Sequence, residues 1–257
     1  MCNLFSMKSY ILYKQSKKSM KNILVLVFVL VAFNGIAQDK VIFNDQHVVL
    51  RDVQDFQTVV IKGPFKVYYS SDAETQVAVS AKDNDSRDRI TTKVNGGTLY
   101  VSLDNSGVKW WGVNKEFKVY ITAPKLNALT LSGAVNFVVI DVLKSMNLSL
   151  ILSGASNFSG KIDAEEIKTN LSGASDCKVS GSANKFDLVC SGASSFKGAD
   201  LKVDEADLDA SGASSIKIHV TETFKAHASG ASSIQYKGSP KIYKQNASGA
   251  SSIRQMN

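Results

Sequence analysis

The side chains that could bind a metal ion or carry acid–base chemistry are few and widely spaced in this sequence. Its three histidines are His47, His219 and His227, and none has a Cys or carboxylate partner at a metal-binding spacing. Neither Cys-x-x-Cys nor His-x-Glu, two common signatures of metal ligands, occurs. We therefore expect no metal site and no cofactor.

Carboxylates gather in two clusters in the second half of the chain. Such clusters can form a row of Asp and Glu, which some β-helical polysaccharide lyases and hydrolases use with Ca²⁺ or as acid and base. When the chain is aligned on the repeat described next, Ser182 falls between the clusters and interrupts the row. A solvated acidic face is the better interpretation, and a polysaccharide-active lyase or hydrolase stays the alternative function. The clusters comprise Asp163, Glu165, Glu166, Asp200, Asp204, Glu205, Asp207 and Asp209.

The motif Ser-Gly-Ala, followed mostly by Ser, occurs seven times. A catalytic serine would need a strand–turn–helix elbow and distant His and Asp partners, and seven copies of it would serve no reaction. Glycine instead permits a tight bend or a close approach between neighbouring chain segments. The glycines are 18 to 21 residues apart, a spacing typical of a solenoid whose repeats stack on one another. They are Gly133, Gly154, Gly173, Gly192, Gly212, Gly230 and Gly249.

Within each repeat, apolar and polar residues alternate with a period of two, which is typical of strands with one buried face. We therefore predict an all-β chain in which residues 126–257 form a right-handed parallel β-helix with coils of about 19 residues. A second set of glycines predicts corners that divide each coil into two or three short strands. These are Gly160, Gly181, Gly198 and Gly238. The apolar position just before each motif is held by Leu131, Leu152, Leu171, Cys190, Ala210, Ala228 and Ala247.

Residues 38–125 form an irregular β-rich region in front of the repeats. Alternating segments at 56–61 and 65–69 flank the turn Lys62-Gly63-Pro64. Asn95-Gly96-Gly97 predicts a hairpin between the segments on either side of it. Since the end repeats of a solenoid are atypical, we expect this region to cover the first coil.

Cys177 and Cys190 are the cysteines that remain after residue 37. The repeat places them six coil positions apart, about 20 Å along an extended strand, whereas a disulfide needs Cα atoms within about 7 Å. A corner between them could shorten that distance. We expect two small buried hydrophobic residues rather than a disulfide.

Residues 1–37 are typical of a signal peptide. The uncharged apolar run Ile23–Phe33 follows four lysines and precedes the small-residue site Gly35-Ile36-Ala37. The run is shorter than the ~20 residues of a membrane span. We expect cleavage after Ala37, no membrane span thereafter, and export to the periplasm, the outer-membrane surface or the medium. Met20 could itself be the true start, which would make residues 1–19 an upstream extension.

The basic charge belongs largely to this leader. Five of the 30 Lys and Arg lie in residues 1–37, so 25 remain against 23 Asp and Glu, and the net charge of the remainder is near +2. No run of Lys and Arg remains that would mark a nucleic-acid surface, so we exclude nucleic acid as a partner.

Trp110 and Trp111 are adjacent between two turn signals. Neighbouring residues of a strand point to opposite faces, so one ring could be exposed and could stack on a sugar or contact a partner protein. The alternative is a core Trp beside a hairpin lid.

Four segments together resemble the head GIN domain family of Bacteroidetes-type bacteria, a family of auto-transporter adhesins. They are residues 61–67 (IKGPFKV), 95–101 (NGGTLYV), 119–126 (VYITAPKL) and 129–134 (LTLSGA). The resemblance covers about residues 52–250 and implies an exported β-helical domain without catalytic residues. It leads us to expect a non-enzymatic cell-envelope protein, acting in binding, adhesion or as a scaffold, with a glycan or an envelope protein as partner.

The apolar positions thin from Leu to Ala toward the last coil, whose edge would present unpaired backbone groups. We favour a homo-oligomer joined end to end, with a separate envelope protein as the alternative.

Overall fold

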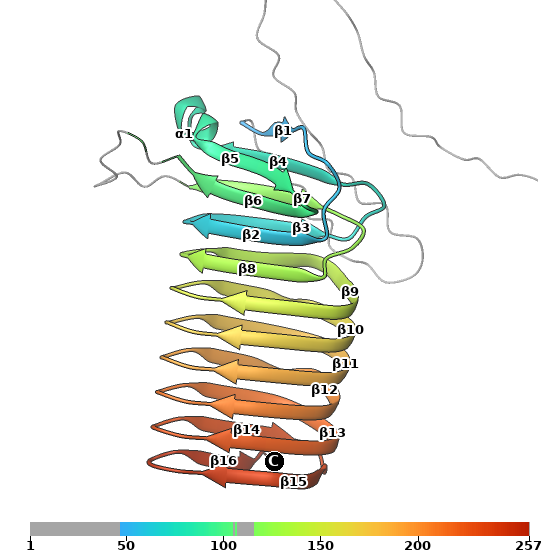
Figure 1. The fold of residues 1–257 in the computed structure, drawn as a ribbon, viewed down its shortest axis with the longest axis vertical. Coiled ribbons are helices and arrows are strands. Elements are labelled where there is room, and N and C mark those ends of the chain that lie inside the picture. The colour runs from blue at the N-terminus through green and yellow to red at the C-terminus, as the bar shows by residue number, and fades with distance from the viewer. Residues whose placement is uncertain (1–46, 105, 107–115, 257) are drawn as a thin grey trace, which may run out of the picture.

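The structure is a computed structural model, and it describes residues 47–104, 106 and 116–256. All sixteen strands of these residues belong to one sheet, which winds into a β-solenoid (Figure 1). The predicted all-β solenoid is therefore confirmed. Trp110, Trp111 and residues 1–37 lie outside the described residues. Within those residues, no helix combines the length and the hydropathy that a membrane span requires.

The elements follow one another as strands interrupted by a single short helix. They are β1 (Val49–Arg51), β2 (Thr58–Gly63), β3 (Phe65–Ser70), β4 (Gln76–Ala81), α1 (Asn84–Asp88), β5 (Ile90–Asn95), β6 (Thr98–Leu103), β7 (Phe117–Thr122), β8 (Ala128–Gly133), β9 (Asn136–Leu152), β10 (Asn157–Leu171), β11 (Asp176–Cys190), β12 (Ser195–Ala210), β13 (Ser215–Ala228), β14 (Ser233–Lys237), β15 (Lys241–Ala247) and β16 (Ser252–Gln255).

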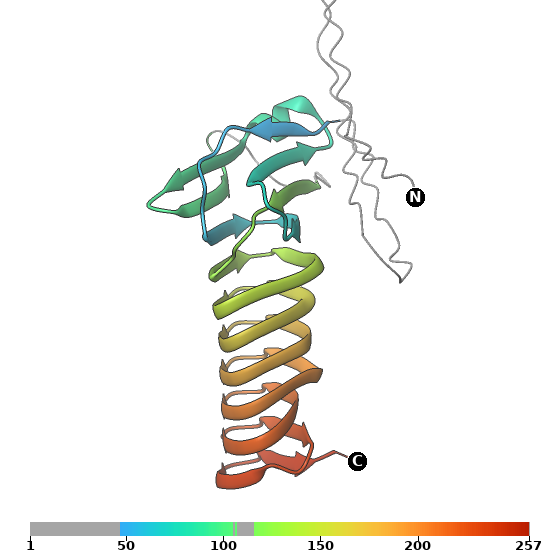
Figure 2. The same cartoon turned by 90° about the vertical axis from the view of Figure 1, so that its right-hand side faces the viewer.

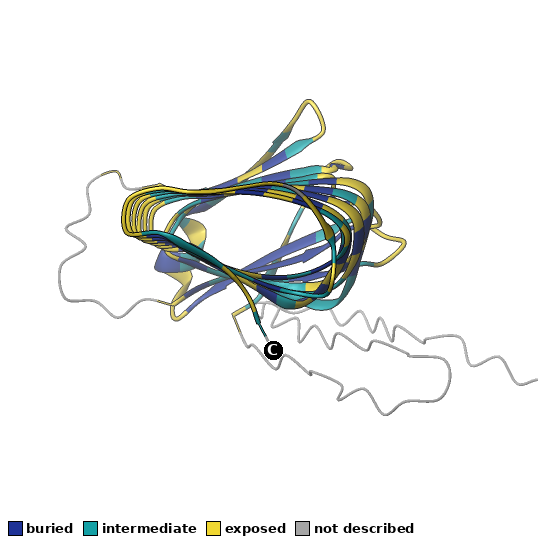
Figure 3. Ribbon diagram, turned by 90° about the horizontal axis from the view of Figure 1, so that it is seen from below, coloured by how far each residue is buried: buried dark blue, intermediate teal, exposed yellow. Residues whose placement is uncertain are grey.

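Each middle coil is one long strand that bends and returns, rather than two or three short strands. The glycine turns stack along one edge of the solenoid and the wide bends along the other (Figures 2 and 3). Gly160, Gly181 and Gly198 lie inside β10, β11 and β12, where the chain bends without ending the strand, so the predicted division of each coil into short strands is wrong. The parallel neighbours keep most of their pairing through the bend, so no separate turn forms. Gly238 does lie at a corner, between β14 and β15.

The Ser-Gly-Ala motif forms the tight turn and locks each coil to the previous one. Gly192 has φ +70, and a Cβ there would lie 2.6 Å from the carbonyl oxygen of Gly173. The next residue, Ala193, donates its backbone N–H to that same oxygen at 2.8 Å. The serine after the alanine is buried and donates to turn carbonyls, as Ser175 does to Ser172 at 2.8 Å. The motif is thus fitted to close stacking of backbone on backbone.

The glycine stack continues into the region before the repeats. Gly63 pairs in register with Gly133, and a Cβ on Gly133 would lie 3.1 Å from the Gly63 nitrogen. Lys62-Gly63-Pro64 therefore takes the place that Ser-Gly-Ala takes in the later coils. Strands β2 and β3 form the coil around it, and the pair β6 and β7 stacks on the other side of that coil.

The upper end of the solenoid is covered by the chain that links these coils. Strand β4 pairs antiparallel with β7, and β5 forms a hairpin with β6 through Gly96 and Gly97, both with positive φ. Helix α1 lies at the top beside them (Figure 1). This agrees with the expectation that the region covers the first coil and that Asn95-Gly96-Gly97 is a hairpin turn.

The core is a column of side chains stacked from coil to coil. The rings of Phe137 and Phe158 stack with centroids 5.7 Å apart, and Tyr69 stacks on Phe137 at 6.1 Å. Cys177 takes the next place in that column, below Phe158. Both Cys177 and Cys190 are free and buried, so they act as small hydrophobic residues.

Candidate functional site

The flattened coils give the solenoid two broad sheet faces. We call the face built by the strand segments that follow the glycine turns the post-turn face, and the opposite one the pre-turn face. On the post-turn face the hydrogen-bonded order is β1, β4, β7, β3, β9, β10, β11, β12, β13, β14 and β16. Because side chains alternate between the two sides of a strand, its outward side chains line up in rows across the strands.

Two such rows run side by side along the solenoid. The first row consists of Ser80, Lys118, Lys66, Asn136, Asn157, Asp176, Ser195, Ser215, Ser233 and Ser252. The second row consists of Tyr120, Tyr68, Val138, Ser159, Lys178, Lys197, Lys217, Gln235 and Arg254.

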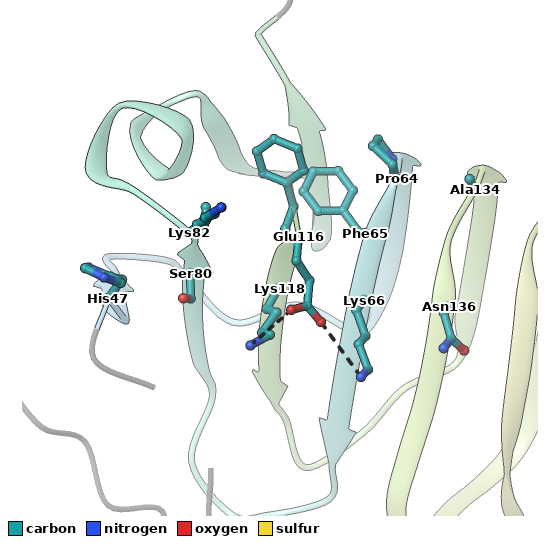
Figure 4. A pocket seen from close by; sticks show the side chains of 12 residues that line it. His47, Pro64, Phe65, Lys66, Ser80, Lys82, Glu116, Lys118, Ala134 and Asn136 are labelled. Atoms are coloured by element: carbon teal, nitrogen blue, oxygen red, sulfur yellow. Dashed lines mark ion pairs between the residues drawn. The ribbon is translucent and has the colours of Figure 1, made fainter. Parts of the chain in front are cut away.

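A groove of about 790 Å³ opens at the upper end of the first row. Residues of β4, β7, β3 and β9, which lie side by side in this order, line the groove together with His47 (Figure 4). Glu116 lies between two lysines, with one carboxylate oxygen 3.6 Å from Lys118 Nζ and the other 3.9 Å from Lys66 Nζ. Lys82 and His47 also line the groove, so three lysines accompany the single carboxylate. The groove is suited to an anionic or polar ligand.

Lys66 is held in place by aromatic neighbours on the second row. Its Nζ lies 5.5 Å from the centroid of the Tyr68 ring, and that ring stacks on Tyr120 at 5.5 Å with an interplanar angle of 11°. A hydrogen bond with Tyr68 and attraction to Tyr68 and Glu116 raise the pKa of Lys66 above its ordinary value. The cation is therefore positioned before any ligand arrives.

Further down, the second row becomes a run of cationic side chains. Lys178 pairs in register with Lys197, and Lys197 with Lys217. All three are exposed, as is Arg254 two strands on. Lys197 forms an ion pair with Asp176 of the first row. Among the described residues, no carboxylate lies within ion-pair distance of Lys178 or Lys217. We call Lys178, Lys197 and Lys217 the lysine row.

Three lysines of the pre-turn face, Lys168, Lys185 and Lys225, are arranged differently, because each lies near a carboxylate. Lys168 contacts Glu166 at 3.0 Å, and Lys185 lies 3.9 Å from both Glu166 and Asp187. On the next two coils, Lys225 of β13 lies 4.0 Å from Asp207 of β12. The charges of this face thus largely neutralise one another.

The acidic row suggested by the sequence is interrupted, as expected. Asp163 lies in register with Ser182, which donates a hydrogen bond to it at 3.0 Å, and Ser182 lies in register with Lys202. Asp200 pairs instead with Ser180. This row is therefore broken at Ser182, although Asp187 and Asp207 stand in register on the neighbouring strands β11 and β12.

The three histidines are dispersed across the structure. His47 lines the groove, while His219 lies in register with Lys202 and His227 with Asp209. In the part of the chain that the structure describes, no group of three or more His, Cys, Asp and Glu is placed to bind a metal ion. These residues give the groove no acid–base pair.

Sequence reasoning did not identify the groove or the lysine row, although both leave a signal in the sequence. The tetrapeptide Phe-Lys-Val-Tyr occurs at 65–68 and again at 117–120, and the two copies lie side by side in register. The lysine row occupies the fifth position after three successive repeat glycines. Aligning the polar positions as carefully as the apolar ones would have revealed it.

Comparison with known proteins places these features in a family. A family model described as "Putative auto-transporter adhesin, head GIN domain" matches residues 55–240. The fold resembles a "putative adhesin" from Bacteroides fragilis, with TM-score 0.72 and 22% identity over 82% of this chain and 98% of that one. It also resembles a "putative lipid binding protein" from Parabacteroides distasonis, with TM-score 0.64 and 19% identity over 82% and 96% of the two chains.

A third similar structure is a "putative adhesin" from Parabacteroides merdae, with TM-score 0.62 and 18% identity over 82% and 95% of the two chains. No curated protein sequence matches this chain. At these identities the structural matches establish the fold. Their descriptions name adhesion or lipid binding and no enzyme.

Proposed function

We propose that this chain, which belongs to the head GIN domain family of auto-transporter adhesins, is a non-enzymatic exported protein of the cell envelope that binds a ligand on its post-turn face. The observation that carries the proposal is the groove between Lys66, Lys118 and Lys82, which opens onto a continuous face of polar and cationic rows. The hydrogen bonds between stacked turns make this sheet rigid, and a rigid binding surface loses less conformational entropy when a ligand binds.

The composition of the groove supports binding rather than catalysis. Hydrolysis of a glycosidic bond by the common mechanisms needs two carboxyl groups that flank the bond. The residues lining this groove include one carboxylate, Glu116, and it is already ion-paired with Lys66 and Lys118. The neighbouring groups can hold a ligand by charge and hydrogen bonds, but they do not form a pair of general acid and base.

Location at the cell envelope rests on the signal peptide of residues 1–37 and on the family. Fractionation of the native host should place the protein outside the cytoplasm. Mass spectrometry of that material should show Gln38, or its pyroglutamate, as the first residue. Recovery of the intact leader in the cytoplasm would contradict export.

A glycan array tests the binding function directly. The protein produced in its host, fluorescently labelled, should bind at least one class of glycan or a purified envelope fraction. The variants Lys66→Gln and Lys118→Gln should weaken that binding, because both cations face the groove. Absence of binding to every glycan and to the envelope fraction would refute the proposed function.

We also propose that two copies of the chain associate through the lower end of the solenoid. Strands β15 and β16 form the lower edge of the described sheet, and Ile242 on β15 is 45% exposed. An exposed strand edge is a template for pairing with another strand. Light scattering at micromolar concentration should therefore detect a dimer, and a clean monomer would rule out this mode of assembly.

A further inference from the structure

We infer that the post-turn face binds an acidic polysaccharide lengthwise, with the lysine row contacting the anionic groups of successive sugars. This inference rests on the proposed binding function and names the ligand class. Its first support is the arrangement of Lys178, Lys197 and Lys217, which stand in register on three neighbouring parallel strands. Neighbouring strands are about 4.8 Å apart, so three like charges are held close together.

Like charges directly opposite each other in a sheet destabilise it. On the pre-turn face of the same region, Lys168, Lys185 and Lys225 each have a carboxylate within 4.0 Å. On the post-turn face, one carboxylate, Asp176, serves the whole lysine row. The three pre-turn lysines have carboxylates as register neighbours, whereas the members of the lysine row have one another. An anionic ligand on the post-turn face would relieve the repulsion that remains there.

The geometry of the face suits a long, thin ligand. From β7 to β16 the strands of the post-turn face are parallel and in register, so both outward rows run along the length of the solenoid. Eight strand spacings separate β7, which carries Lys118, from β16, which carries Arg254, and they span about 38 Å. The cationic groove lies near one end of these rows and the lysine row nearer the other. Asn136 lines the groove, Asn157 and Ser159 lie between it and the lysine row, and all three can donate and accept hydrogen bonds with sugar hydroxyls.

Other polyanions fit the face less well. A membrane surface would favour exposed apolar anchors beside the lysine row, yet Ile151 and Val189, which are 43% and 47% exposed, lie on the pre-turn face, and Leu50 lies on β1 at the far end of the post-turn face. Single-stranded nucleic acid is usually bound through aromatic rings that alternate with cations. Around the lysine row the outward neighbours are serines, Asp176 and Gln235 instead, and the rings of Tyr68 and Tyr120 lie at the other end of the face.

The test measures binding of the host-produced protein to polygalacturonate by affinity electrophoresis, with neutral dextran as the comparison polymer. The triple variant K178Q/K197Q/K217Q removes the lysine row. The matched control K168Q/K185Q/K225Q removes three lysines from the pre-turn face and so changes the net charge equally. Circular dichroism and thermal unfolding check that both variants keep the fold.

We expect polygalacturonate to retard the wild-type protein and dextran to leave its mobility unchanged. The lysine-row variant should lose at least about tenfold in affinity and the control less than about twofold. Equal losses in the two variants, or none in the first, would overturn the inference. So would tighter binding to anionic lipid vesicles or to DNA than to polygalacturonate.

The same panel separates failure of the inference from failure of the proposed function. Binding to dextran or to neutral glycans on the array, without binding to polygalacturonate, would overturn the acidic ligand and leave the binding function standing. Absence of binding to any glycan and to the envelope fraction would overturn both.

Discussion

Replacing Gly192 by Ala should destabilise the solenoid by more than the conformational cost of its positive φ alone. Gly192 has φ +70, a conformation that costs an L-residue with a Cβ about 1–2 kcal/mol. The new methyl would also lie 2.6 Å from the Gly173 carbonyl oxygen, which belongs to backbone and cannot swing away. The coils must separate locally to relieve that contact.

Separation would lengthen the hydrogen bond from the Ala193 N–H to the same oxygen, which is now 2.8 Å. Losing one such bond costs about 1 kcal/mol. Together with the conformational cost, we expect the free energy of unfolding to fall by about 2–3 kcal/mol. In a solenoid, stability depends on contacts between neighbouring repeats, so a loosened central interface weakens the whole stack.

The matched control is Gly96→Ala. Gly96 also has positive φ, +55, but a Cβ there would meet no atom within 4 Å. Its cost is therefore the conformational one alone, about 1 kcal/mol. Urea unfolding followed by circular dichroism should give a loss for Gly192→Ala that exceeds that of Gly96→Ala by at least about 1 kcal/mol. Equal losses would refute the argument that the motif serves close coil-to-coil stacking.

Two further predictions concern buried ionisable groups. Burial raises the pKa of the Cys190 thiol to about 11 and also raises the pKa of the Cys177 thiol. At pH 8 neither thiol should therefore react with a thiol reagent until the protein is unfolded, which peptide mass spectrometry can measure. Rapid labelling of the native protein would contradict the burial of these thiols. Burial likewise raises the pKa of Asp141, so the native state takes up its proton at higher pH than the unfolded state does. Lowering the pH from 7 to about 4 should therefore raise the free energy of unfolding of the wild type relative to that of D141N, and a constant difference across this range would show that the pKa is not raised.

Much of the solenoid could be predicted because its repeats obey one local rule. Each Ser-Gly-Ala copy imposes the same turn, and the period of two between the turns gives the same strand. Because glycine often ends a strand, the sequence predicts corners that would divide the coils at Gly160, Gly181 and Gly198. In the structure the pairing with adjacent coils carries the strand through, which is a tertiary effect that a single repeat does not reveal.

The upper coils were harder to predict because their neighbours are distant in sequence. Strand β2 lies between β6 and β8, so the coil around Gly63 is inserted between two coils that come later in the chain. That order depends on which strands pair after the chain has folded back, and it cannot be read from alternation alone. The groove was hard to predict for the same reason, since Lys66 and Lys118 are 52 positions apart in sequence and adjacent in space.

The central claim is that the post-turn face, and not its opposite, carries the ligand. Lysine acetylation of the host-produced protein, with and without polygalacturonate, would map that contact by mass spectrometry. The account predicts that the polymer protects the lysine row, Lys178, Lys197 and Lys217, and leaves Lys168 and Lys225 as reactive as before. Protection of the pre-turn lysines with continued labelling of the lysine row would contradict it.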